Sequence, residues 1–232
     1  MGTDHGRLAL QLVLSEKCPF VYATDIKEEP LAKAKKLAAR FNVQDKMICK
    51  LTNGLQGILP HEVDDAIIAG LGGETIAEII ADTPWLKDKA KRLILVPAGK
   101  PELLRDYLYK NGFSIEEEVA AEAKGRIYTA MRAMYTGTPQ KFTAKNIYIG
   151  KLTEVKTDLA RQYIKKVLSI ITEERKGREK SLHQEDILPK GAAKKKARSA
   201  LKREKDRTEA GQLSLEELLL LEKEIESVLK KW

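Results

Sequence analysis

A glycine-rich segment at the start of the chain is the first pattern that could bind a ligand. Gly2-Thr3-Asp4-His5-Gly6 precedes an apolar stretch, Leu8–Leu14, with helical spacing. Glycines at a strand-to-helix turn let a ligand approach the backbone closely. The spacing is not G-x-G-x-x-G, which argues against a nicotinamide dinucleotide. The carboxylate of Asp4 suits a cationic group, such as the amino-acid end of S-adenosylmethionine, and a plain glycine-rich turn is the alternative.

A second carboxylate follows at the end of the next predicted strand. The apolar run Phe20–Thr24 predicts a buried strand, and Asp25 comes directly after it. In Rossmann-like folds a carboxylate at this position accepts hydrogen bonds from ligand ribose hydroxyls. Asp25 is also suited to cap a helix predicted at Glu28–Arg40, and it could serve in both ways.

Two further turns follow predicted strands and consist largely of small residues. An Asn side chain at Asn53-Gly54 could bond the edge of an adenine ring, although Asn-Gly also favours a simple turn. Ala69-Gly70-Leu71-Gly72-Gly73 follows the fourth strand, where catalytic groups of this fold class lie. This segment is nearly bare of side chains, which suits a target that needs little proton abstraction, such as a ring nitrogen. Close helix–strand packing is the alternative interpretation.

Strands and helices alternate through residues 1–135, which predicts an α/β fold. The sheet should be mainly parallel, with helices on both faces, and closed by a final pair of strands. The predicted strands are Phe20–Thr24, Met47–Cys49, Asp65–Ala69, Leu93–Val96, Phe113–Val119 and Ile127–Met134, and the predicted helices are Glu28–Arg40, Thr75–Ala81 and Pro101–Lys110.

The pattern becomes purely helical in the last third of the chain. One apolar stripe is expected at Leu152, Val155, Leu159, Tyr163, Val167 and Ile170. A second helix begins at a capping box formed by Ser214 and Glu217 and carries Leu218, Leu221, Ile225 and Val228. We therefore expect an antiparallel, coiled-coil-like hairpin. The chain divides into a Rossmann-like domain at 1–140 and a basic helical hairpin domain at 141–232.

Positive charge is concentrated in the last third of the chain. The formal net charge is +8, and residues 151–232 hold 21 Lys and Arg against 15 Asp and Glu. A polyanion such as RNA is the expected partner, and a solvated charged helix pair is the alternative. The candidate RNA-binding residues are Lys194, Lys195, Lys196, Arg198, Lys202 and Arg203.

Other features restrict the class of protein. Only Cys18 and Cys49 are present, which favours a reducing cytosol and predicts no metal site. No apolar run is long enough to span a bilayer, and Met1–Leu14 does not have the pattern of a signal peptide. We expect a cytoplasmic protein with no membrane partner, and a monomer.

The ordered motifs resemble the bacterial tRNA (adenine-22-N1)-methyltransferases. The match consists of Gly-Thr-Asp-His-Gly, Ala-Thr-Asp-Ile, Asn-Gly-Leu and Ala-Gly-Leu-Gly-Gly, with Pro101, Leu104-Arg105, Gly112-Phe113, Glu122 and Tyr128. The resemblance covers nearly the whole chain and implies methyl transfer from S-adenosylmethionine to N1 of a tRNA adenine in the D-arm region. It implies that the cofactor and target cavity is lined by Gly2–Gly6, Asp25, Ile26, Asn53, Gly54 and Ala69–Gly72. No catalytic side chain is assigned.

Three features of the chain depart from the family pattern. Asn53 replaces the usual Asp, and Leu71 replaces the usual Met. Family members also have a helix and a strand before the first motif, whereas this chain starts at Met1 within it. We expect the strands at Phe20–Thr24 and Asp65–Ala69 to lack a shared neighbour, and the working protein to be longer.

Two other functions compete with methyl transfer. A non-catalytic RNA-binding or assembly protein would use the very basic segment Lys190–Arg207, the basic tail, and keep the first domain as a relic. S-adenosylmethionine binding would distinguish it from an enzyme. An NAD-dependent oxidoreductase is disfavoured because its glycine fingerprint is missing.

Overall fold

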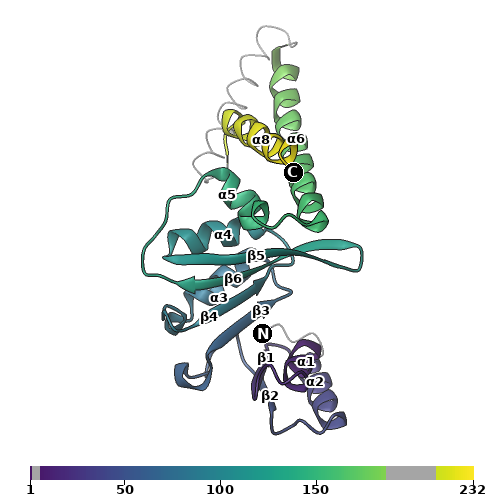
Figure 1. Cartoon of the computed structure of the whole chain (residues 1–232), viewed down its shortest axis with the longest axis vertical. Coiled ribbons are helices and arrows are strands. Elements are labelled where there is room, and N and C mark those ends of the chain that lie inside the picture. Colours follow the sequence, from purple (N-terminus) through teal and green to yellow (C-terminus); the bar gives the residue numbers. More distant parts are fainter. Residues whose placement is uncertain (2–5, 187–212) are drawn as a thin grey trace. The chain divides into compact units, whose positions relative to one another are not determined.

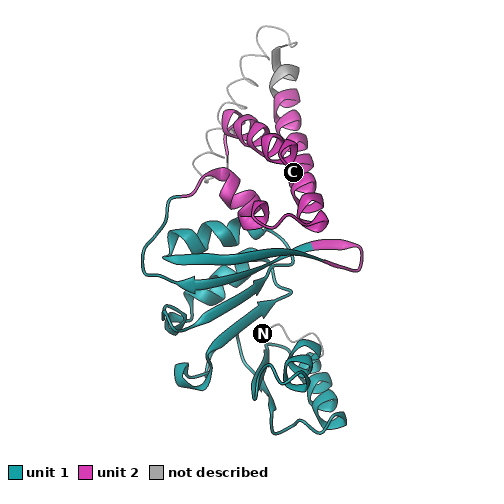
Figure 2. Cartoon of the chain, in the orientation of Figure 1, with its two compact units in different colours: residues 1–121, 128–141 teal, residues 122–127, 142–232 magenta. Residues whose placement is uncertain are grey.

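The computed structural model describes residue 1, residues 6–186 and residues 213–232. The chain forms two compact units (Figures 1 and 2). Unit 1 consists of residues 1–121 and 128–141, and unit 2 consists of residues 122–127 and 142–232.

Unit 1 begins with two parallel strands that pack against two helices (Figure 1). The elements are α1 (Arg7–Leu14), β1 (Val21–Asp25), α2 (Glu28–Arg40) and β2 (Met47–Leu51). Ala23 on β1 lies opposite Cys49 on β2. Apolar residues at helical spacing on α1 and α2 pack with the strands in one core of Leu10, Val13, Ala23, Ala34, Ala38, Val43 and Met47.

The rest of unit 1 is a four-stranded sheet in the order β3-β4-β6-β5. Its strands are β3 (Asp65–Ala69), β4 (Arg92–Val96), β5 (Phe113–Ala123) and β6 (Arg126–Tyr135), with helices α3 (Gly73–Ala81) and α4 (Pro101–Lys110). Two short 3-10 helices, η1 (Pro60–Glu62) and η2 (Pro84–Leu86), precede β3 and β4. β3 and β4 are parallel, and β6 runs antiparallel to β4, so the expected final pair does close the sheet.

The two sheets of unit 1 are separate. In the part of the chain that the structure describes, β1 pairs with β2 and β3 pairs with β4, but β1 does not pair with β3. The amino group of Met1 donates a 2.8 Å hydrogen bond to the carbonyl oxygen of Ile67 on β3. The Ala69 amide also donates to the Met1 carbonyl at 3.5 Å, so Met1 lies beside β3, and no strand of the described residues joins β3 to β1.

A buried polar network ties α4 to the β5–β6 hairpin. The guanidinium of Arg105 on α4 donates to the carboxylate of Glu118 on β5 at 2.6 Å, and both side chains are fully buried. The hydroxyl of Thr129 on β6 donates to the same carboxylate oxygen. Buried charges are tolerated when they are paired and hydrogen-bonded, so these three residues fix α4 against the hairpin.

Unit 2 contains α5 (Ala144–Ile149), the 3-10 helix η3 (Gly150–Thr153), α6 (Asp158–Asp186) and α8 (Leu215–Lys230). Arg178 bonds to Leu213 and Thr172 bonds to Glu222, so α6 and α8 run antiparallel, as predicted. The predicted capping box is present, because the hydroxyl of Ser214 accepts from the Glu217 amide at 3.2 Å and Glu217 accepts from the Ser214 amide at 2.7 Å.

The buried stripe of α6 differs from the predicted one. Ile170 is 53% exposed, whereas Ile164 and Ile171 are fully buried. Adjacent positions on a helix point about 100° apart, so the prediction of Ile170 as a core residue was wrong by one position.

Candidate functional site

The carboxyl end of β1 carries the first predicted site residue. Asp25 is the last residue of β1, and its carboxylate accepts a 2.9 Å hydrogen bond from the Lys27 amide. This bond forms a local turn just before α2, whose N-cap is Lys27, so Asp25 does not cap the helix as one interpretation had it. The neighbouring Ile26 is 64% exposed. A carboxylate and an apolar side chain are therefore presented together at this strand end.

Backbone and side-chain hydrogen bonds join the end of β1 to the turn that follows β2. The Thr52 amide donates to the Asp25 carbonyl at 3.0 Å. The hydroxyl of Thr24, a residue that is 1% exposed, donates to the Gly54 carbonyl at 3.2 Å. The Asn53-Gly54 turn, with Gly54 at φ +64°, is thus held beside the end of β1. The structure therefore brings Asp25 and the Asn53-Gly54 turn close together.

The same turn lies against α3. A Cβ atom at Gly54 would lie 3.5 Å from Cγ2 of Ile79 on α3. Ile79 lies in the second turn of α3, so the turn after β2 is placed near this helix.

The loop after β3 is braced by the loop after β4. Gly70 has φ +79°, and its amide donates to the Val96 carbonyl at 3.0 Å. The Ala98 amide donates to the Leu71 carbonyl at 2.8 Å, and the Gly73 amide donates to the Gly99 carbonyl at 2.8 Å. A Cβ atom at Gly73 would lie 2.1 Å from the Lys100 carbonyl oxygen, so only glycine fits there.

Open space adjoins these paired loops. A Cβ atom at Gly70 or Gly99 would meet no atom within 4 Å in the described structure. Lys100 and Glu74 form an ion pair of 2.7 Å across the two loops. The 97–100 loop was not predicted as part of the site, although its small residues after a predicted strand repeat the pattern of Ala69–Gly73.

A hydrogen bond connects β1 to the segment before β3. The Tyr22 hydroxyl donates to the Glu62 carboxylate at 2.7 Å, which raises the pKa of Tyr22. The Leu59 amide and then the Tyr22 hydroxyl hold the pKa of Glu62 below its usual range. These bonds attach the small sheet to the chain entering β3, and so help to set Asp25 relative to the β3 loop.

Several predicted site residues lie outside the described residues. These are Gly2, Thr3, Asp4 and His5, together with the RNA-binding candidates Lys194, Lys195, Lys196, Arg198, Lys202 and Arg203. Gly6 is described: it has φ +72°, and a Cβ there would lie 2.5 Å from Cε of Met47 and 2.8 Å from Cβ of Ala34. The first glycine-rich motif therefore ends at a close contact between α1, α2 and β2.

The described residues contain neither a candidate metal site nor a candidate membrane-spanning helix. No group of three or more His, Cys, Asp or Glu side chains is placed to hold a metal ion there. Among the helices in the described ranges, none has the length and apolar character needed to cross a membrane.

Comparison with known proteins assigns the family. The family described as "Methyltransferase domain" matches residues 1–131, more than half of the chain. This chain belongs to the methyltransferase domain family. The match thus includes Asp25, the Asn53-Gly54 turn and the Ala69–Gly73 loop, which together we call the strand-end site.

A relative of known name agrees with this assignment. The chain is 30% identical over 133 residues to the tRNA (adenine(22)-N(1))-methyltransferase of Bacillus subtilis, an alignment that covers 57% of this chain and 56% of that protein. The alignment therefore spans little more than half the length of that relative.

Solved structures share the fold of the methyltransferase domain and of the helical unit. A Streptococcus agalactiae protein of the NADB-Rossmann superfamily has a TM-score of 0.72 at 22% identity, covering 97% of this chain and 88% of its own. The M. capricolum TrmK protein in complex with S-adenosylhomocysteine has a TM-score of 0.66 at 21% identity, covering 98% of this chain and 89% of its own. The Rossmann-like fold expected from the sequence is confirmed.

Proposed function

We propose that this protein transfers a methyl group from S-adenosylmethionine to N1 of an adenine in tRNA, at position 22. One observation carries the proposal: the Thr24–Gly54 bond holds the Asn53-Gly54 turn beside Asp25 at the carboxyl end of β1, while the Ala69–Gly73 loop follows the carboxyl end of β3. Ligands of open α/β sheets bind outside the carboxyl ends of the strands, where these residues lie. The methyltransferase family and the name of the B. subtilis relative support this reaction and this substrate.

The residues present fit S-adenosylmethionine. Asp25 offers a carboxylate for ribose hydroxyls, and Asn53 offers an amide for an adenine edge. The open space beside Gly70 and Gly99 lets a ligand reach the backbone of both loops. Gly2–Gly6 would complete the binding site, as the family resemblance implies. When bound, the cofactor supplies an electrophilic methyl group on a sulfonium, and the neutral thioether that remains is a good leaving group.

The role of the chain in this reaction is mainly alignment. Within Ala69–Gly73 no side chain can act as a general base, and adenine N1 has a free lone pair that needs no proton removal. Holding donor and acceptor in line can lower a barrier by about 7–11 kcal/mol in favourable cases. The target base must be unstacked to enter the site, and the small loop residues leave room for it.

The basic tail would bind the rest of the tRNA. We assign phosphate contacts to Lys194, Lys195, Lys196, Arg198, Lys202 and Arg203, on the basis of their charge in the sequence. A tRNA substrate also implies a cytoplasmic location. We also propose that the protein is a monomer, which gel filtration can test.

The decisive experiment is a methylation assay on two tRNA transcripts that differ only at position 22. With S-adenosylmethionine carrying a labelled methyl group, the transcript with A22 should gain label and the transcript with G22 should not. Primer extension should stop at position 22, because N1-methyladenine cannot form a Watson–Crick pair. Calorimetric binding of S-adenosylhomocysteine without methylation of either transcript would favour another substrate. The absence of both binding and methylation would favour a non-catalytic protein.

A further inference from the structure

The two halves of α6 differ in how their charges are arranged. No Asp or Glu occurs between Leu159 and Thr172, although this stretch contains Arg161, Lys165 and Lys166. From Glu173 onward, acidic and basic residues are interspersed.

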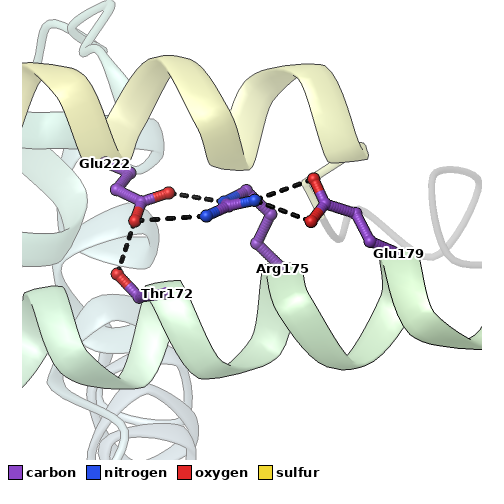
Figure 3. A network of polar contacts seen from close by, with 4 residues as sticks. All are labelled: Thr172, Arg175, Glu179 and Glu222. Carbon is purple, nitrogen blue, oxygen red and sulfur yellow. Dashed lines mark hydrogen bonds and ion pairs between the residues drawn. The ribbon is translucent and has the colours of Figure 1, made fainter.

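The arginines of the second half have structural partners, and Figure 3 shows those of Arg175. Arg175, 16% exposed, donates to Glu222 of α8 at 2.5 Å and to Glu179 at 2.8 Å, and the Thr172 hydroxyl donates to Glu222 at 2.7 Å. Arg178 donates to the Leu213 carbonyl at 2.6 Å. These bonds hold α6 against α8 and explain why cations are needed there.

The cations of the first half have no such explanation. Arg161, Lys165 and Lys166 are exposed, and no ion pair or side-chain hydrogen bond to them occurs within the described ranges. Arg161 lies close to the N-terminus of α6, where the helix dipole favours anions. Arg161 and Lys165 are four residues apart, a spacing at which like charges repel. Asp158, the first residue of α6, is three residues before Arg161 and can offset its charge, but Lys165 and Lys166 have no acidic residue within four positions along the helix.

The net positive charge of the chain lies in unit 2, because the charges of unit 1 cancel. Unit 1 contains 18 Lys and Arg and 18 Asp and Glu, whereas unit 2 contains 24 and 16. A polyanionic partner would therefore be attracted to unit 2 rather than to unit 1. RNA is the polyanion that the proposed function requires.

We propose that Arg161, Lys165 and Lys166, the α6 cationic face, bind phosphates of the tRNA substrate. Successive helical turns are about 5.4 Å apart, so Arg161 and Lys165 can contact the same strand of RNA together. An RNA phosphate placed between them relieves their mutual repulsion. This inference rests on the proposed function and adds a contact surface to the sequence-based tail residues.

The test removes the three charges and measures tRNA binding at several salt concentrations. The variant is Arg161→Gln/Lys165→Gln/Lys166→Gln. The matched control, Lys176→Gln/Lys180→Gln/Lys223→Gln, removes the same charge from exposed positions among acidic residues of unit 2. Each lost phosphate contact reduces the slope of log K against log salt by about 0.7–0.9. The first variant should therefore lose about 2–3 in slope, and the control should lose less than 1. A variant with Lys165→Arg and Lys166→Arg keeps the charge and should bind normally.

Kinetics and a cofactor analogue separate the possible outcomes. The triple variant should raise KM for tRNA at least tenfold, with an unchanged affinity for S-adenosylhomocysteine and an unchanged circular dichroism spectrum. An unchanged salt slope, or an equal loss in the control, would overturn the α6 contact. So would weakened binding to phosphatidylserine vesicles without any change for tRNA. If the unmodified protein neither binds nor methylates tRNA, the proposed function itself fails, which is a separate result.

Discussion

The hydroxyl of Thr24 donates a hydrogen bond of 3.2 Å to the carbonyl of Gly54, thirty positions further along the chain. Thr24 is 1% exposed and precedes Asp25 on β1. The bond places the turn after β2 at the same strand ends as the Asp25 carboxylate. Through this contact, two segments that lie far apart in the sequence are held side by side at the end of β1.

Replacing Thr24 by Val should therefore loosen the Asn53-Gly54 turn. The variant keeps the shape of the side chain but removes the donor to a buried carbonyl, which costs about 1–3 kcal/mol of unfolding free energy. Calorimetry should also show weaker binding of S-adenosylhomocysteine. Thr24→Ser retains the hydroxyl and should bind nearly normally. Equal affinities for Thr24→Val and the unmodified protein would remove Thr24 from the site.

Asp25→Ala should weaken S-adenosylmethionine binding by about 1.5–3 kcal/mol, the usual effect of losing charge-assisted hydrogen bonds. The measurement is calorimetry on a variant shown to be folded by circular dichroism. Asp45→Ala, at an exposed loop position, is the control and should have no effect. Unchanged affinity in folded Asp25→Ala protein would rule out the ribose contact.

Two glycines of the site should respond oppositely to alanine. Gly73→Ala places a methyl group 2.1 Å from the Lys100 carbonyl and should destabilise the fold by about 1–3 kcal/mol through overpacking. Gly99→Ala meets open space and should leave the unfolding free energy nearly unchanged. Chemical denaturation measures both. Similar losses in the two variants would show that the loops are not arranged as described.

Glu222→Gln should destabilise the α6–α8 pair in a pH-dependent way. The bond from Arg175 holds the pKa of Glu222 below its ordinary value of 4.5. A carboxyl group with a lowered folded-state pKa stabilises the fold above its unfolded pKa, and this stabilisation is lost as the pH falls through the folded-state pKa. The variant should lose about 1.5–3 kcal/mol near neutral pH.

This difference should remain constant down to about pH 5 and shrink below it, because the unfolded pKa is near 4.3–4.5. Denaturant unfolding followed by circular dichroism between pH 3 and pH 7 is the measurement. Glu226→Gln, exposed and one turn further on, is the control. A difference independent of pH would mean that the ion pair is not responsible.

Replacing Lys194, Lys195, Lys196 and Arg198 by Ala should weaken tRNA binding and flatten its salt dependence. Cofactor affinity should not change, because these residues belong to the basic tail rather than to the strand-end site. Filter binding over a range of salt concentrations tests this. The same slope in variant and unmodified protein would return these residues to an ordinary solvated surface.

Local structure in this chain was predictable from the sequence. The helices Glu28–Arg40 and Pro101–Lys110 and the strand Asp65–Ala69 have the predicted bounds. The Ser214–Glu217 capping box was equally readable, since it spans only four positions. Side-chain periodicity and capping depend on residues only a few positions apart, so the local sequence is enough to predict them. The ordered glycine and aspartate motifs likewise pointed to the correct family.

The tertiary structure decided which distant residues meet. No local sequence pattern predicts three of the pairs that meet in the structure: Thr24 with Gly54, Gly73 with Lys100, and Arg175 with Glu222. It also decided that Ile171 rather than Ile170 faces the core of unit 2, because both are apolar and a helix turns about 100° between them. Periodicity sets the secondary structure. Hydrogen-bond geometry and close packing between elements far apart in the chain select the register in which those elements meet.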